Sequence, residues 1–320
     1  MDEPSIASAA PRVTVGVPVY NGARFLGETL DALRAQSLRD IEVIVADNAS
    51  TDGSLEIAEK AAAEDPRFRV VTADRNRGVP WNFNRLVDAA RAPAFMWNAS
   101  DDVARPDHLL RCVQALDDTP EATIAFSRVV LVDADGNRVG EMDDDALDFE
   151  SLDPAGRVRL FFARHVYQVI GFGGVIRTAV LRDLGRLPQR YGGDLELAVR
   201  MAVRAPFVQV PEQLYVSRRH DDQTNKVQGG DVLDQVRVYR PDWKRPVAFP
   251  QWSLDGALLR AAASAPLSWP GRAATVGSVL SEWAVPNWRL LAFDLKRNAV
   301  RLARGRYEGD YRPTASASDE

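Results

Sequence analysis

Two adjacent carboxylates, Asp101 and Asp102, follow a run of apolar residues and precede a proline at position 106. Neighbouring carboxylates repel each other unless a helix N-terminus, a basic side chain or a divalent cation offsets their charge. Aspartate is also an ordinary turn residue, so a solvated turn is the alternative interpretation. The choice between the two depends on the other groups that the surrounding elements bring to this place.

The first part of the chain alternates between apolar β-type runs and helical periods. Runs that contain VTVGV, EVIVA, FRVVT and AFMW predict buried strands, and amphipathic helical segments separate them. This alternation predicts parallel βαβ units in an open, doubly wound sheet, whose ligands bind beyond the carboxyl ends of the strands. The residues at those ends, mostly polar, are Pro18, Tyr20, Asn21, Asp47, Asn48, Asp52, Asp74, Asn76, Gly78 and the two acids.

Composition and missing motifs exclude several classes of protein. Of the 320 residues, 40 are Lys or Arg and 45 are Asp or Glu, and the net charge of −5 argues against nucleic-acid binding. No G-x-G-x-x-G or G-x-x-x-x-G-K-[ST] motif is present, which disfavours a dinucleotide dehydrogenase and a P-loop ATPase. The single cysteine, Cys112, excludes an intramolecular disulfide and a cysteine-based zinc site, and its helical surroundings predict a buried structural thiol. With no signal peptide and no apolar run of about 18 residues, we expect a cytoplasmic protein without a transmembrane segment.

Beyond residue 123 the pattern changes. The stretch 123–141 predicts a β-hairpin with an Asp-Gly turn, and the acidic stretch 141–150 is interpreted as a solvated charge run, with a mobile flap as the alternative. The stretch 207–220 predicts a pair of strands. Helices separated by prolines are expected after Pro250.

Five stretches in this order resemble the family 2 glycosyltransferases, the inverting nucleotide-sugar enzymes with the GT-A fold: VTVGVPVYNGARFLGETLDALRAQS, IEVIVADNASTDGS, NRGVPWNFN, SDDVARPDHL and GGDLEL. The resemblance covers residues 12 to 225, and its first two stretches are the specific ones. It implies an α/β fold of the GT-A type, a Rossmann-like, open and mostly parallel sheet flanked by helices, with a small C-terminal helical extension.

The resemblance also divides the chain. A GT-A domain is expected over 12–250, with a nucleotide-binding half at 12–122 and an acceptor half at 123–250. A flexible N-terminus (1–11), a C-terminal helical subdomain (251–310) and a disordered tail (311–320) complete the expected organisation.

For the donor nucleotide, the resemblance implies contacts from the loops that follow the first three strands. The loop of Pro18, Tyr20 and Asn21 would lie against the nucleotide, and Asp47 would accept hydrogen bonds from the base or ribose. The remaining donor-binding candidates that it implies are Asn76, Gly78, Asn82 and Ser100.

The family's D-x-D motif, which holds Mg²⁺ or Mn²⁺ on the diphosphate, is incomplete here. Aligned through Pro106, Asp101 takes the metal-binding second position, while Ala99 occupies the first. Asp102 stands beside it as a second candidate ligand. His220 is implied as a further metal or phosphate ligand, assisted by Arg218 and Arg219, with a solvated surface loop as the alternative. Mg²⁺ often needs only one or two carboxylates besides substrate phosphates, so the acid pair still favours a metal site.

An inverting transfer also needs a base that takes the proton of the acceptor hydroxyl. Asp194 in YGGDLEL matches the family's base, with Gly193 in place of a preceding Glu. A helix N-cap is the alternative role for Asp194, and Glu196 is the fallback base. His108 is interpreted as a surface residue, and no role is assigned to His165. The stretch 171–174, GFGG, is interpreted either as a loop at the donor sugar or acceptor or as a plain tight turn.

Near the C-terminus, residues 287–307 predict an amphipathic helix rich in cations and with one acid, Asp294. Packing as the last helix of the domain is the favoured interpretation, and contact with an anionic membrane surface or a dimer contact are the alternatives. The cationic residues of this stretch are Arg289, Lys296, Arg297, Arg301, Arg304 and Arg306.

Together these patterns predict an inverting, metal-assisted glycosyltransferase with Asp194 as general base. The donor expected from the family is a UDP-sugar, and the acceptor is a hydroxyl of a saccharide, a lipid-linked sugar or a natural product. The alternatives are a nucleotidyltransferase and a non-catalytic nucleotide-sugar-binding protein, the latter because Ala99 and Gly193 replace two family acids. A homodimer and peripheral contact with a membrane are the further associations that the sequence suggests.

Overall fold

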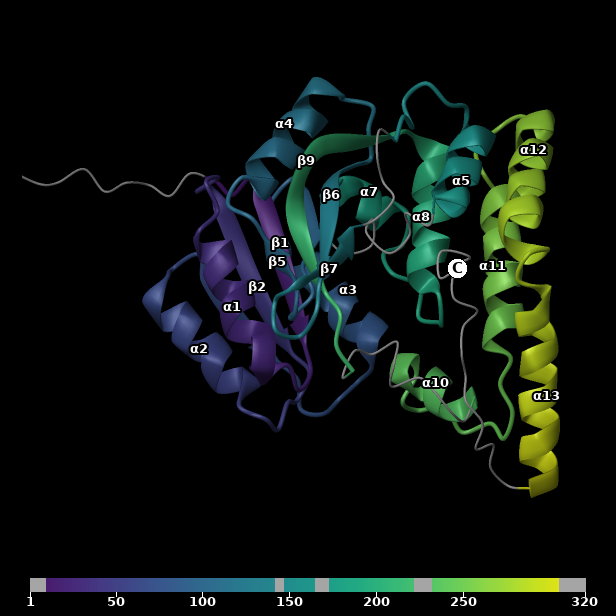
Figure 1. The fold of residues 1–320 in the computed structure, drawn as a ribbon, viewed down its shortest axis with the longest axis horizontal. Helices are drawn as coiled ribbons and strands as arrows, with labels where there is room; N and C mark the ends of the chain where they lie inside the picture. Colours follow the sequence, from purple (N-terminus) through teal and green to yellow (C-terminus); the bar gives the residue numbers. More distant parts are fainter. Residues whose placement is uncertain (1–9, 142–146, 165–172, 222–231, 305–320) are drawn as a thin grey trace, which may run out of the picture.

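The computed structural model describes residues 10–141, 147–164, 173–221 and 232–304. Within them one mixed sheet has the strand order β3-β2-β1-β4-β8-β6-β9-β5, and β7 pairs with β6 (Figure 1). The strands are β1 Val13–Val19, β2 Ile41–Asp47, β3 Phe68–Thr72, β4 Ala94–Trp97, β5 Val103–Ala104, β6 Ile124–Val132, β7 Arg138–Glu141, β8 Val175–Arg177 and β9 Phe207–Arg218.

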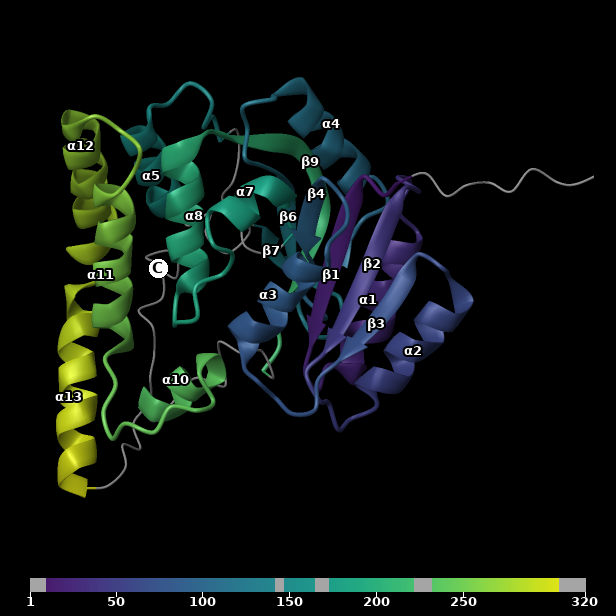
Figure 2. The same cartoon turned by 180° about the vertical axis from the view of Figure 1, so that it is seen from behind.

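Helices flank this sheet on both faces and continue into a C-terminal column (Figures 1 and 2). In the first half they are α1 Ala23–Arg34, α2 Ser54–Glu64, α3 Val79–Ala89 and α4 His108–Asp118. In the second half they are α5 Pro154–Ala163, α7 Thr178–Asp183, α8 Gly193–Arg204, α10 Val232–Tyr239, α11 Pro250–Ala263, α12 Trp269–Val279, the π-helical turn η1 Leu280–Ala284 and α13 Trp288–Arg304.

The four strands predicted in the first part of the chain are present and parallel. β1 pairs with β2 from Val13 opposite Ile41, and with β4 from Val13 opposite Ala94. Every residue of β1 and β2 is buried, as expected for strands covered by helices on both faces. Parallel pairing brings the carboxyl ends of these strands to one edge, where the candidate site residues follow.

The second half contains one confirmed and one wrong prediction. The β6–β7 hairpin is present, and its turn places Gly136 of the Asp-Gly pair at φ +85°. The predicted pair of strands at 207–220 is instead one long strand, β9. Its register against β6 shifts between the Ser127–Val210 and Arg128–Gln213 pairs, so a bulge accommodates Pro211 within one strand.

The C-terminal helices pack on the GT-A part of the molecule. Leu254 and Leu258 of α11 and Val279 of α12 belong to the same hydrophobic cluster as the sheet. A separate small cluster joins α10 to the segment before α11 through Val232, Leu233, Val236 and Ala248. Cys112 is fully buried on α4, and burial raises the pKa of its thiol, which confirms the prediction of a structural thiol.

Among the residues that the structure describes, no helix has both the length and the apolar character that crossing a bilayer requires.

Candidate active site

The loop after β2 is shaped by Asp47, whose side chain is 2% exposed. Its carboxylate accepts hydrogen bonds from the backbone amides of Ala49 and Ser50, at 3.0 and 3.1 Å. Ala49 adopts a positive φ of 64°, which these two bonds help to hold. Asp47 therefore lies at the predicted edge, and in this structure it organises the loop.

The loop after β1 is tied to the loop after β2. The side-chain oxygen of Asn21 accepts from the backbone amide of Thr51 at 2.8 Å, and the backbone amide of Asn21 donates to Ser50 Oγ at 3.0 Å. The amide of Ala23 donates to the Asp52 carboxylate at 3.0 Å. Pro18 is buried inside β1, whereas Tyr20 is half exposed beyond it. Tyr20 and Asn21 are thus the members of this loop that are open to a ligand.

The loops after β2 and β3 are joined by two asparagines. Asn48 Nδ2 donates to Asn76 Oδ1 at 2.9 Å, and the same oxygen accepts from the Gly78 amide at 2.9 Å. Gly78 has φ +87°, and a Cβ atom there would lie 2.8 Å from Pro241 Cδ. Both the backbone conformation and the close approach of the chain after α10 therefore require glycine at this position.

Asn82 and Arg85 of α3 fasten the ends of the strands together. Asn82 is buried, its Nδ2 donates to the Ala46 carbonyl at 2.8 Å, and its Oδ1 accepts from Arg85 Nε at 2.8 Å. The guanidinium of Arg85 also donates to the carbonyls of Asp47 and Thr72, at 2.6 and 2.8 Å. Sequence reasoning missed Arg85, and its signal was the i, i+3 spacing from Asn82 on a helix that begins at the strand edge.

Beyond β4 the two acids diverge in role. Asp101 Oδ2 lies 2.8 Å from His220 Nε2, and the structure thus brings together the predicted metal residue and the predicted histidine from 119 positions further along the chain. Asp102 is 6% exposed, and its Oδ1 accepts from the amide of Arg218 at 2.9 Å. Ser100 precedes the pair, and its side chain lies close to Gly22 in the loop after β1.

Burial and charge combine at Asp102. Desolvation, reinforced by the negative charge of Asp101, raises the pKa of Asp102 to about 7, against the opposing hydrogen bond from the Arg218 amide. A cation beside the pair would relieve this repulsion. The acids in the structure thus carry the electrostatic imbalance that the sequence pattern suggested.

Arg218 supports this region from within the protein. Its guanidinium donates to Glu28 at 2.6 Å and to the carbonyl of Asp101 at 3.2 Å, and it lies 4.6 Å above the ring of Phe25. The same ring lies 4.8 Å from that of His220. Arg218 is 4% exposed. It bonds to both acids of the pair and stacks on the Phe25 ring, which in turn contacts the His220 ring.

The metal ligands that the protein offers here suit Mg²⁺ or Mn²⁺ only if the substrate supplies further ligands. Asp101 offers a partly exposed carboxylate oxygen and His220 a ring nitrogen. Within the described ranges no group of three or more His, Cys, Asp or Glu side chains is arranged to hold a metal ion. Mg²⁺ commonly takes one or two carboxylates together with substrate phosphates and water, so these residues fit a metal that arrives with a diphosphate.

Asp194 lies in the first turn of α8 and lines a small apolar pocket with Phe83, Trp97 and Leu187. Burial raises the pKa of its carboxyl group, which suits a general base because a more basic carboxylate takes a proton more readily. The N-cap of α8 is Gly192, so the alternative prediction of an Asp194 cap is wrong. Trp97 is the last residue of β4, so Asp194 lies near the strand end that Asp101 follows.

The fallback base, Glu196, is held in ion pairs with two arginines. Its carboxylate is 3% exposed, pairs with Arg190 at 3.2 Å and forms a short ion pair with Arg200. These contacts place Glu196 in the packing of α8. Among the two acids of this helix turn, Asp194 is the one that faces a pocket.

The prediction that His108 is a surface residue is wrong. It is fully buried, and its ring nitrogens contact Ser127 Oγ at 3.1 Å and the Gly173 carbonyl at 2.6 Å. Burial lowers its pKa to about 4, so the ring is neutral. Gly173, at φ +94° against the ring of Tyr215, also donates to the Trp97 carbonyl at 2.9 Å. His108 therefore holds the end of the GFGG stretch against β4, while residues 171 and 172 and His165 lie outside the described residues.

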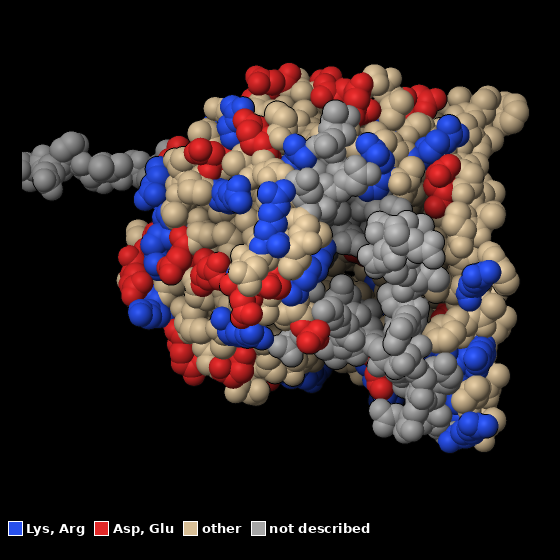
Figure 3. All heavy atoms as spheres, viewed as in Figure 1, with Lys and Arg blue, Asp and Glu red and all other residues tan. Residues whose placement is uncertain are grey.

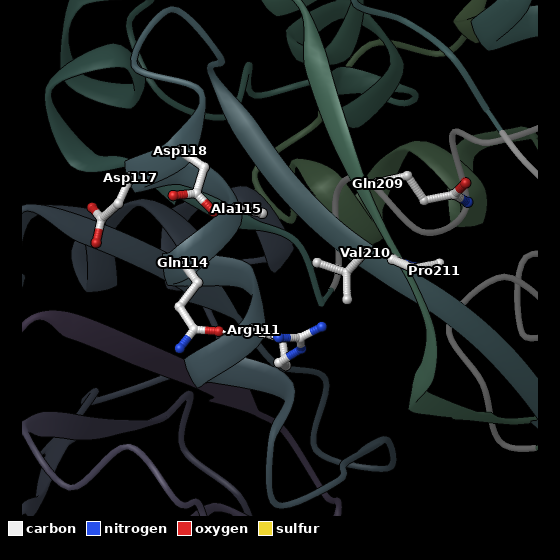
Figure 4. Close-up of a pocket in the computed structure, with 8 residues that line it drawn as sticks. All are labelled: Arg111, Gln114, Ala115, Asp117, Asp118, Gln209, Val210 and Pro211. Carbon is white, nitrogen blue, oxygen red and sulfur yellow. Dashed lines mark hydrogen bonds between the residues drawn. The ribbon is translucent and has the colours of Figure 1, made fainter.

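A surface depression between α4 and β9 is separate from this site (Figure 4). It is lined by Arg111, Gln114 and Asp118 of α4 and by Gln209 and Pro211 of β9. Those β9 residues lie near the start of the strand, whereas Arg218 and His220 lie at and beyond its end. The candidate active site is therefore the strand edge with Asp101, His220 and the three cross-linked loops.

Comparison with known proteins identifies the family of this chain. The family model Glycosyl transferase family 2 matches residues 14–185, more than half of the chain, and the chain belongs to this family. A relative, the succinoglycan biosynthesis protein ExoO of Rhizobium meliloti (strain 1021), is 35% identical over 136 residues, which are 42% of this chain and 38% of that protein. The chain spans about a fifth to two fifths of the length of curated relatives that it matches.

Solved structures establish the GT-A fold. TarS 1–349 of S. aureus in complex with UDP-GlcNAc superposes with a TM-score of 0.60 at 16% identity, over 87% of this chain and 75% of that one. Mannosyltransferase PcManGT of Pyrobaculum calidifontis, in complex with GDP-Man and Mn²⁺, superposes with a TM-score of 0.50 at 20% identity, over 93% and 88%. The expected fold class, with its C-terminal helices, is confirmed.

Proposed function

We propose that this chain transfers a sugar from a nucleotide-sugar donor, first of all a UDP-sugar, to an acceptor hydroxyl with inversion at the anomeric carbon. The observation that carries the proposal is the contact of 2.8 Å between Asp101 and His220 beyond the end of β4. It lies at the edge where the loops after β1, β2 and β3 are cross-linked by Asn21, Asn48 and Asn76. Family membership and the donor complexes of the structural neighbours support it.

For the donor nucleotide, the chain provides the three cross-linked loops that follow β1, β2 and β3. Tyr20 and Asn76 are exposed there, and Gly78, packed against Pro241, helps to shape the loop after β3. Asp47 has lone pairs beyond those that its loop uses, and we assign it the hydrogen bonds of the base or ribose. Asn82 acts indirectly, because it holds the ends of β1 and β2 in place.

On the diphosphate side, Asp101 and His220 would hold a divalent cation, with the remaining ligands from phosphate oxygens and water. Such an ion, when bound, stabilises the negative charge that develops on the leaving nucleoside diphosphate. Support comes from PcManGT, whose structure contains Mn²⁺ with GDP-Man. Asp102 keeps β9 against this loop through the Arg218 amide and adds negative charge near the cation.

On the acceptor side, Asp194 takes the proton of the attacking hydroxyl, and its raised pKa supports this role. The hydroxyl oxygen forms the new bond to the anomeric carbon while the bond to the diphosphate oxygen breaks. The name of the succinoglycan biosynthesis relative favours a saccharide as the acceptor.

Thermal unfolding with nucleotides tests the donor and metal sites together. The wild-type protein is heated with UDP, GDP or dTDP sugars, with and without Mn²⁺, and a ligand at about 100 times its Kd raises the stability by about 2.7 kcal/mol. Asp101→Ala should lose the Mn²⁺-dependent part of this shift and the Mn²⁺-dependent hydrolysis of the donor. Asp118→Ala, an exposed acid on α4 away from the site, is the matched control. An unchanged Mn²⁺-dependent shift in Asp101→Ala would contradict the proposed site.

A further inference from the structure

The last helix, α13, turns its polar side toward the protein. Its three buried residues are Asp294, Arg297 and Asn298, at 3%, 0% and 3% exposure. Arg297 donates to Gln235 of α10 at 3.0 Å, and Asp294 accepts from the amide of Gln251 in α11 at 2.8 Å. Asn298 both donates to and accepts from the backbone of Ala248. These bonds fix the rotation of the helix about its axis.

The opposite side of α13 is apolar and exposed. Trp288, Leu295 and Leu302 are 57%, 52% and 68% exposed and stand seven residues apart. Ala292 and Ala299 lie between them and are also exposed. With about 100° per residue, a spacing of alternately four and three residues keeps all five on one face. We call this face the outer strip: Trp288, Ala292, Leu295, Ala299 and Leu302.

Further apolar side chains extend the outer strip. Val285, one turn before α13, is 64% exposed. Trp252 of α11 is 49% exposed and donates its indole N–H to the Leu291 carbonyl of α13 at 3.1 Å, which places its ring beside the helix. A contiguous exposed apolar surface of this kind marks an interaction site rather than an ordinary surface.

Only positive charge borders the outer strip along α13. Arg289 and Lys296 lie next to it on one flank, and Arg304 follows at the end of the helix, all three exposed. Asp294 is the one acidic residue in α13, all of which the structure describes, and it is buried on the other side. Figure 3 shows blue side chains among tan surface along the edge of the molecule that α13 occupies in Figure 1.

We propose that the outer strip of α13 docks on the interface of an anionic lipid bilayer, with the helix lying in the membrane plane. Apolar side chains on one face flanked by Lys and Arg are the features that bind such an interface. Tryptophan favours the same depth, since its ring is apolar and its N–H is polar. The anionic headgroups would meet Arg289 and Lys296.

A second copy of this chain fits the outer strip less well. An antiparallel two-fold pairing would place the flank with Arg289 and Lys296 of one α13 against the same flank of its partner. Like charges would then face each other with no exposed acid of α13 between them. A bilayer with anionic headgroups supplies the opposite charge, which a second copy does not.

Vesicle binding of the full chain tests the proposal. The protein is sedimented with phosphatidylcholine vesicles, with and without phosphatidylglycerol, at low and high salt. We expect binding to the mixed vesicles only, weakened by salt, and reduced about tenfold or more in Leu295→Glu/Leu302→Glu. Lys296→Glu should weaken it by about fivefold or more. Val139→Glu, at an equally exposed apolar residue of β7, is the matched control and should bind as wild type.

Light scattering and thermal unfolding of the same variants complete the test. Equal vesicle binding by wild type and Leu295→Glu/Leu302→Glu, or no binding by either, would overturn the proposal. A dimer that the double variant splits, with no lipid binding, would show that a second copy covers the outer strip. Because these residues are exposed, the melting temperature and donor binding should stay unchanged, so the outcome is independent of the proposed transferase activity.

Discussion

The strand edge and the C-terminal helices bury polar side chains in two different ways. At the strand edge, Asp47 and Asn82 bond to the backbone of the loops and strands around them. Among the C-terminal helices, the bonds join one helix to another: Arg297 of α13 donates to Gln235 of α10, and Trp283 of η1 donates to Asp255 of α11. Both regions satisfy buried polar groups, as stability requires, but the bonds at the strand edge join loops to strand ends, whereas those at the C-terminus join helices to one another and to the segment before α11.

The two sets of bonds join different kinds of element, and this difference has a structural consequence. Side chains that bond to backbone amides and carbonyls hold the loops in one shape, so the strand edge is formed before a ligand arrives. Side chains that pair between helices decide which face of a helix is buried. In α13 the polar partners lie inward, and the apolar residues are left on the outside because they have no polar groups that need partners.

The largest effect is expected at Asp194, because the strand edge should bind donor without it. Asp194→Asn should lower the transfer rate by about 10² or more while donor affinity stays within a few fold. Steady-state transfer and calorimetric donor titration separate the two. A collapse of donor affinity would instead make Asp194 part of the frame that holds the strand edge.

Two buried asparagines provide a matched test of the comparison. Asn82→Ala removes the bond to the Ala46 carbonyl at the strand edge, and Asn298→Ala removes the bonds to Ala248 at α13. Each should cost about 2 kcal/mol in the free energy of unfolding, measured with urea. Donor affinity should fall in Asn82→Ala only. If Asn298→Ala weakens the donor equally, the two regions are coupled rather than separate.

Gly78 is a place where the strand edge meets the C-terminal part of the chain, since Pro241 after α10 packs against it. Gly78→Ala should destabilise the fold by about 1–2 kcal/mol, through the positive φ and the clash with Pro241 Cδ. Gly136→Ala is the control, because its φ is +85° but no atom lies within 4 Å of its added Cβ. The difference in the free energy of unfolding between the two variants measures the cost of the clash with Pro241. Equal losses of stability would show that this clash costs nothing.

The smallest effect concerns pH and Asp294. Burial raises its pKa to about 6 from 3.8, so the folded state binds more protons than the unfolded chain between about pH 4 and pH 6. The contribution of this group to stability therefore falls as the pH rises through that range. Asp294→Asn should be more stable than wild type by about 1 kcal/mol at pH 8, with the difference vanishing near pH 4. Urea unfolding at the two pH values measures it, and a wild type more stable than the variant at pH 8 would contradict the assignment.

Much of the fold could be predicted because its signals are local. The first four strands, the helices between them and the Asp-Gly hairpin follow from periodicity and turn chemistry. The single strand β9 was missed because its proline reads as a break, and only the register against β6 shows the bulge. His108 was misplaced for a similar reason: its partners, Ser127 and the Gly173 carbonyl, are distant in sequence. The domain boundaries at residues 122 and 250 and the cytoplasmic location stay predictions.

The sequence by itself determined the parallel βαβ frame, the family and the strand edge to which Asp47, Asn76 and Asp101 belong. Local periodicity and turn residues are enough for this, because parallel strands must end together at one edge. Only the tertiary structure decided that His220 contacts Asp101 and that Asp102 accepts a hydrogen bond from the Arg218 amide of β9. It also decided that α13 turns its polar side toward the protein. Each of these depends on a hydrogen-bond partner far along the chain, and pairing over such distances is fixed by packing rather than by neighbouring residues.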